Sequence, residues 1–184
     1  WPLRHEPLYT ILARVPTQIG FHHHIGQESD FLYQLTQSGF QILYLKRDNL
    51  LEHAISNIRA RSFGFHRRKL MGKPCGLKIL VDPRLVVDWI KKSECLQKYE
   101  ASLLRNTPHL SLTYEKHLVN ESDHQSTIDA ICDYFSIPSQ PVLSQYQKVS
   151  PRTLQDSVEN YDELVDYLVS TPYIRYLPLE AACH

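Results

Sequence analysis

Residues 41–49 read Gln-Ile-Leu-Tyr-Leu-Lys-Arg-Asp-Asn, a run that changes from apolar to charged within a single segment. Residues 41–45 are apolar at nearly every position, which is typical of a strand buried inside a parallel sheet. The Asp and Asn that follow can cap a helix. The apolar face of that helix would carry Leu51, Ala54, Ile55 and Ile58. Lys46 and Arg47 therefore stand where a strand ends and a helix begins.

The same alternation continues on both sides of this segment. A loop is expected over 62–80, and Asp82 followed by Pro83 is a strong helix start. The apolar periodicity predicts further strands at 17–22 and 110–114 and helices at about 31–38, 84–105, 123–135 and 154–169. Strands that alternate with helices predict an α/β fold, in which a parallel β-sheet is flanked by helices on both faces.

The composition of the 184 residues is that of one globular domain. Hydrophobic residues make up 42% and charged residues 22%, which excludes a disordered tail or a repeat array. The formal net charge is zero at pH 7, so no global field attracts the chain to nucleic acid or to an anionic membrane. Any site for an anion must therefore be built locally.

The cysteines and the apolar runs exclude several other classes. Cys75, Cys95, Cys132 and Cys183 are scattered, with no C-x-x-C pair, which argues against a disulfide scaffold and against a structural zinc site. Reduced thiols of a cytoplasmic protein are the expected state, and nothing in the sequence calls for a metal. No apolar run approaches the ~20 residues that span a bilayer, and no signal peptide opens the chain.

The strand end at Arg47 is the best candidate for a binding site. Ligands of open parallel sheets lie beyond the carboxyl ends of the strands, and a helix that begins there favours an anion. Ser56 lies two turns along the expected helix, off its apolar face. Arg47 and Ser56 could together bind a phosphate, the arginine bidentately and the serine as a neutral donor. A surface arginine and a helix serine without a joint role fit the spacing equally well.

Three stretches resemble elements of the sulfotransferase family, most of all its bacterial branch. Residues 44–51, Tyr-Leu-Lys-Arg-Asp-Asn-Leu-Leu, with Ala-Ile-Ser at 54–56, resemble the element that binds the 3′-phosphate of 3′-phosphoadenosine 5′-phosphosulfate (PAPS). Residues 112–118, Leu-Thr-Tyr-Glu-Lys-His-Leu, with Tyr-Phe-Ser-Ile at 134–137, are similar to a Y-E-D/x-L strand and a helix ending in F-L-G-I/V. Residues 148–164 are similar to a K…I-x-N-Y-x-E-L tail.

The resemblance implies a role for each matching residue. Arg47 and Ser56 would bind the 3′-phosphate. Tyr114 matches a tyrosine that reaches the adenine, although a half-buried strand aromatic is the alternative. Lys148 would approach the cofactor through a looser alignment. Glu115 is expected to be a capping or structural carboxylate.

The general base has two candidates. His22, His23 and His24 follow the first expected strand, where family members carry a histidine that deprotonates the acceptor hydroxyl. Imidazole has a pKa near the working pH, and His24 fits this role if the strand aligns with the G-F-K strand of the bacterial branch. Many bacterial members are thought to use an upstream glutamate, which makes Glu6 a competitor.

One family element has no counterpart in the chain. Sulfotransferases open with a strand and a glycine-rich loop that cradles the 5′-phosphosulfate, whereas no glycine precedes Gly20. We therefore expect residues 1–184 to form a single sulfotransferase-like domain that lacks this strand and loop. Loss of the element from the sequence at hand is favoured over a protein that has no transferase activity.

The resemblance as a whole implies a cytoplasmic, bacterial sulfotransferase with a fold like that of the P-loop nucleotide kinases. It would transfer a sulfuryl group from PAPS to a hydroxyl or amine of an acceptor that the sequence does not identify. The alternative is a non-catalytic nucleotide-binding or interaction domain that kept the fold. A nucleoside kinase ranks third, because it needs a Walker-type G-x-x-x-x-G-K that is absent from the sequence.

Overall fold

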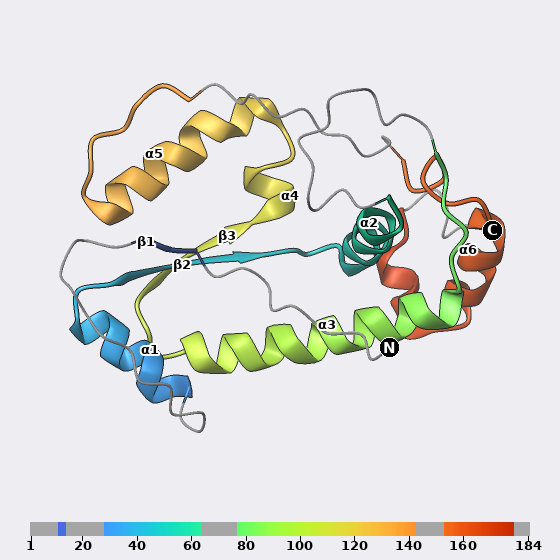
Figure 1. The fold of residues 1–184 in the computed structure, drawn as a ribbon, viewed down its shortest axis with the longest axis horizontal. Helices are drawn as coiled ribbons and strands as arrows, with labels where there is room; N and C mark the ends of the chain where they lie inside the picture. Colours follow the sequence, from blue (N-terminus) through green and yellow to red (C-terminus); the bar gives the residue numbers. More distant parts are fainter. Residues whose placement is uncertain (1–10, 14–27, 64–76, 143–152, 179–184) are drawn as a thin grey trace. The chain divides into compact units, whose positions relative to one another are not determined.

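The computed structural model in Figure 1 describes residues 11–13, 28–63, 77–142 and 153–178. The chain divides into two compact units. The first unit comprises Trp1–Asp48 and Gln97–Ser144, and the second comprises Asn49–Leu96 and Gln145–His184.

The first unit is built on a three-stranded sheet with the order β1 (Ile11–Ala13), β2 (Gln41–Lys46), β3 (His109–Thr113). β1 runs antiparallel to β2, and β2 runs parallel to β3. The register of the parallel pair sets Ile42 opposite His109 and Lys46 opposite Thr113. β2 and β3 therefore end together at one edge of the sheet. The strands predicted at 41–45 and 110–114 are confirmed, whereas the strand predicted at 17–22 lies outside the described residues.

Helices lie on both sides of this sheet (Figure 1). On one face, Ile42 and Tyr44 pack with Leu104 of α3 (Pro83–Leu104) and Leu32 of α1 (Glu28–Gln37). On the other face, the Gln41 amide donates to a carbonyl of α5 (His124–Phe135), at 3.0 Å. Alternation of side chains along the strand produces this two-sided packing. A mixed α/β architecture with a parallel pair flanked by helices is thus confirmed.

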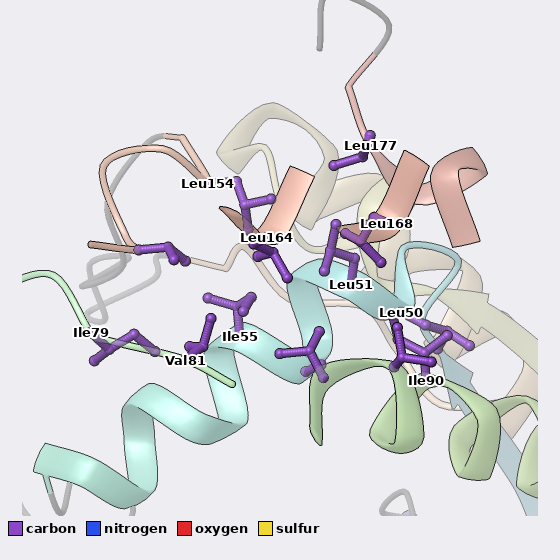
Figure 2. Close-up of a cluster of buried hydrophobic side chains, with 14 residues drawn as sticks. Leu50, Leu51, Ile55, Ile79, Val81, Ile90, Leu154, Leu164, Leu168 and Leu177 are labelled. Atoms are coloured by element: carbon purple, nitrogen blue, oxygen red, sulfur yellow. The ribbon is translucent and has the colours of Figure 1, made fainter. Parts of the chain in front are cut away.

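The second unit is held together by aliphatic side chains from α2 (Leu50–Phe63), from the first part of α3, and from α6 (Tyr161–Val169). A 3₁₀ helix, η3 (Pro172–Tyr176), follows α6. Figure 2 shows Leu51 of α2 beside Leu168 of α6, and Leu50 of α2 close to Ile90 of α3. Burial of such side chains contributes about 1.5–3 kcal/mol each before conformational entropy is subtracted.

Side-chain caps place the helix starts where the sequence predicts them. The Asn49 side chain accepts a hydrogen bond from the Glu52 N–H at 3.1 Å, and Asp82 accepts one from the Arg84 N–H at 2.9 Å. Each cap satisfies a backbone donor that the first helical turn leaves open. α1 ends just before Gly39, whose φ of +82° favours a residue without Cβ.

The prediction of a helix over 154–169 is wrong in its first half, because α6 begins only at Tyr161. Val158 instead forms a parallel bridge with Ile79. The Ile79 N–H donates to the Ser157 carbonyl at 2.9 Å, and the Glu159 N–H donates to the Ile79 carbonyl at 2.8 Å. These bonds use backbone groups that a helix would need, and they also pair part of the segment predicted as a loop over 62–80.

Asn160 extends this pairing with its side chain. Its amide nitrogen donates to the Val81 carbonyl at 2.8 Å, and its amide oxygen accepts from the Val81 N–H at 3.0 Å. The amide nitrogen also donates to Glu163 at 2.9 Å. Two residues of the N-Y-x-E-L stretch thus have a structural role within the second unit.

Two smaller boundaries also differ from expectation. β3 ends at Thr113, and Tyr114 begins the short helix α4 (Tyr114–His117) rather than closing the strand. The helix predicted over 123–135 begins at His124, after a 3₁₀ turn, η2 (Glu121–Asp123). None of the described helices has the length and apolar character needed to cross a membrane.

Candidate functional site

Arg47 and Tyr114 come together at the edge of the sheet where β2 and β3 end. Each is the first residue after its strand, and the register pairs the preceding residues, Lys46 and Thr113. The Arg47 guanidinium carbon lies 3.8 Å from the centroid of the Tyr114 ring. This distance is well within the range of a cation–π contact. Both side chains are half-buried.

The two cations at this strand end differ in their partners. The Lys46 ammonium forms an ion pair with Asp48 at 3.1 Å. No described carboxylate lies within ion-pair distance of Arg47. A guanidinium has five N–H donors, and a cation–π contact with Tyr114 does not need them all, so donors are left for a planar or tetrahedral anion. Arg47 is therefore the better anion ligand of the two.

The backbone that carries Arg47 is held by two more side chains. The Gln97 side-chain nitrogen, from α3, donates to the Arg47 carbonyl at 2.7 Å. The Asp48 N–H donates to a carboxylate oxygen of Glu115, in α4, at 2.9 Å. Glu115 thus has the structural role that its sequence position suggested.

The structure does not test the other predicted site residues. Ser56 lies in α2, is half-buried, and belongs to the second unit, whereas Arg47 belongs to the first. Their joint binding of one phosphate stays a prediction. Glu6, His24 and Lys148 lie outside the described residues, and their roles also stay predictions.

Sequence reasoning missed a polar pair on the α1 and α3 face of the sheet. The Tyr44 hydroxyl donates to Glu100 of α3 at 2.8 Å. Burial raises the pKa of the Glu100 carboxyl, while the hydrogen bond from Tyr44 acts to lower it. Burial and Glu100 together raise the pKa of the Tyr44 hydroxyl. A tyrosine within a buried strand needs a partner for its hydroxyl, and this requirement was the available signal.

Gln97 was also missed, and no local signal could have found it, because its contact with Arg47 joins positions 50 residues apart. In chemical terms the site offers one stacked guanidinium on a fixed backbone, which suits an anion. Among the described residues, no group of three or more His, Cys, Asp or Glu side chains is arranged to hold a metal ion. Family models, curated proteins and solved structures contain no match to the chain.

Proposed function

We propose that the protein is a PAPS-dependent sulfotransferase in which Arg47 binds the 3′-phosphate of the nucleotide. The observation that carries the proposal is the stacked guanidinium of Arg47, which has no described carboxylate partner and lies where two parallel strands end. A phosphate at this edge would meet the charge and donor geometry that it requires. The likeness of residues 44–56 to the family's 3′-phosphate element supports the same assignment.

Tyr114 fits this proposal with a restriction. One face of its ring is covered by the Arg47 guanidinium, so an adenine contact would use the opposite face or the phenol hydroxyl. The finer fold assignment, a P-loop nucleotide-kinase-like sulfotransferase fold, would make β2 and β3 two strands of its parallel sheet. Ser56 would be the second phosphate ligand.

The chemistry asked of the chain is binding, orientation and one proton transfer. PAPS supplies the activated sulfuryl group, which passes to the acceptor oxygen or nitrogen as the bond to the 5′-phosphate breaks. Arg47 would bind the nucleotide at its 3′-phosphate, away from the bond that breaks. The free energy of this contact would help to orient the sulfuryl group toward the acceptor. His24 or Glu6 would take the acceptor's proton.

Nucleotide binding tests the phosphate assignment by calorimetry. Adenosine 3′,5′-bisphosphate should bind more tightly than AMP, which lacks the 3′-phosphate. Arg47→Ala should weaken binding of the bisphosphate by about 2–3 kcal/mol, the scale of a charge-assisted contact, and Ser56→Ala by roughly 1 kcal/mol. Lys46→Ala is the matched control and should cost less than about 1 kcal/mol, because Lys46 is paired with Asp48. Wild-type affinity in Arg47→Ala would refute the assignment.

A transfer assay separates the enzyme from a non-catalytic domain. Labelled PAPS is incubated with phenol, sugar and amine acceptors, and the sulfated product is measured. Selective binding of the bisphosphate without any transfer would favour the nucleotide-binding domain instead. Equal stabilisation of the fold by AMP and by the bisphosphate would favour a kinase-like site.

A further inference from the structure

The peptide unit between Arg47 and Asp48 is held at both of its polar ends. Its carbonyl oxygen, on Arg47, accepts from the Gln97 amide at 2.7 Å. Its N–H, on Asp48, donates to the Glu115 carboxylate at 2.9 Å. The two partners come from different helices, α3 and α4. The strand pairing of β2 ends at Lys46, so the sheet does not hold this peptide.

Holding both ends of one peptide fixes the direction in which Arg47 leaves the strand. Rotation of the peptide plane would break both hydrogen bonds at once, and the one to Glu115 has a carboxylate as its acceptor. Tyr114 then restrains the far end of the same residue through its ring. An arginine that is fixed before a ligand arrives loses less side-chain entropy on binding.

We infer that Gln97 and Glu115 are positioning residues for Arg47. By holding Arg47 in place, they set the preference of the site for a nucleotide that carries a 3′-phosphate. This part of the inference rests on the function proposed above. Neither side chain is required to touch the nucleotide. Gln97 acts through the Arg47 carbonyl, and Glu115 acts through the Asp48 N–H.

The inference predicts a defined pattern among matched variants. Gln97→Met keeps the length of the side chain but removes the donor, and should lower the affinity ratio of adenosine 3′,5′-bisphosphate over AMP about two- to tenfold. Gln34→Met makes the same change on an exposed residue of α1 and should leave the ratio unchanged. Glu115→Leu should lower the ratio as Gln97→Met does. Glu115→Gln keeps an acceptor oxygen and should preserve it.

A second measurement needs no ligand. Protons of the Arg47 side chain that lie over the Tyr114 ring should show an upfield ring-current shift in the NMR spectrum of the free protein. Gln97→Met should reduce this shift, and Gln34→Met should not. The two readouts therefore test the position of Arg47 separately from what it binds.

The possible outcomes separate the inference from the proposed function. If wild-type protein prefers the bisphosphate but Gln97→Met matches Gln34→Met in ratio and in ring-current shift, the inference is overturned and the function stands. If Glu115→Gln behaves like Glu115→Leu, positioning by Glu115 is overturned. If wild-type protein binds both nucleotides equally, the proposed function and the selectivity role fall, while the ring-current shift still decides whether Gln97 positions Arg47.

Discussion

The two units of the chain differ in the size of their apolar clusters. The second unit gathers aliphatic side chains from α2, α3, α6 and the paired segments around Ile79 and Val158. The first unit buries a smaller cluster on its sheet. One member of that cluster, Tyr44, donates a hydrogen bond to the partly buried carboxyl of Glu100. Both units also bury polar side chains, among them Arg59 in the second and Thr127 in the first, so the difference lies in the aliphatic cluster, which is larger in the second unit.

Polar side chains also have different roles in the two units. In the second unit, Asn160 completes the backbone pairing of Val81, which is a structural task. In the first unit, Gln97 and Glu115 hold the backbone of a residue whose own guanidinium has no described carboxylate partner. A polar network that leaves one cation available is what an anion site needs, and it is the reason to look for ligands on the first unit.

The largest expected effect is the loss of packing in the second unit. Leu168 of α6 is fully buried, whereas its neighbour Val169 is 45% exposed. Leu168→Ala should lower the free energy of unfolding by about 2–5 kcal/mol, through lost burial and the cavity that remains. Val169→Ala should change it by about 0.5 kcal/mol or less. Urea denaturation followed by circular dichroism measures both. Similar losses in the two variants would contradict the idea that the second unit depends on its aliphatic core.

A smaller effect concerns the stacked arginine of the first unit. Tyr114→Leu removes the ring and should weaken binding of adenosine 3′,5′-bisphosphate by about 1 kcal/mol, the scale of a partly exposed cation–π contact. Tyr114→Phe keeps the ring and should retain most of the affinity. Tyr99→Leu, on a tyrosine of α3 that is 46% exposed, is the matched control and should have no effect.

The comparison with AMP decides how Tyr114 acts. If the ring works through Arg47, AMP binding should change little, and combining Tyr114→Leu with Arg47→Ala should add little to the loss caused by Arg47→Ala alone. Equal losses for AMP and the bisphosphate would instead indicate a direct adenine contact.

The sequence predicts β2 and the starts of α2 and α3 well, because these signals are local. The apolar run at 41–45 and the caps at Asn49 and Asp82 each depend on a few neighbouring residues, and all are confirmed. The placement of Arg47 at the carboxyl edge of a parallel pair follows from them. The stack on Tyr114 does not, since it requires the register of β2 against β3 and the departure of Tyr114 from the strand.

Non-local pairing explains the main error in the second unit. Apolar residues recur at helical spacing in this segment, and the pattern predicts one continuous helix. These residues are Leu154, Val158, Tyr161, Leu164 and Leu168. The backbone bonds between Ile79 and the residues flanking Val158 connect positions almost eighty residues apart, which no local periodicity reveals. Tertiary pairing therefore overrides the local pattern up to Asn160, and helical structure resumes only at Tyr161.

The smallest expected effect tests the cost of polar burial in the first unit. Burial raises the pKa of Glu100, so the folded protein binds this proton more tightly than the unfolded chain does. The contribution of Glu100 to stability is then fully present below its ordinary pKa of about 4.3 and is lost as pH rises through the raised folded value. Glu100→Gln imitates the protonated form and can still accept the Tyr44 hydroxyl. Relative to wild type, the variant should therefore gain free energy of unfolding as pH rises from about 4 to 7. Urea denaturation across this range measures the difference.

Glu121→Gln, on an exposed carboxylate of the same unit, should show no such gain. A difference between Glu100→Gln and wild type that stays constant with pH would mean that the carboxyl is as well solvated in the fold as in the unfolded chain. The Tyr44–Glu100 pair would then carry no cost in stability.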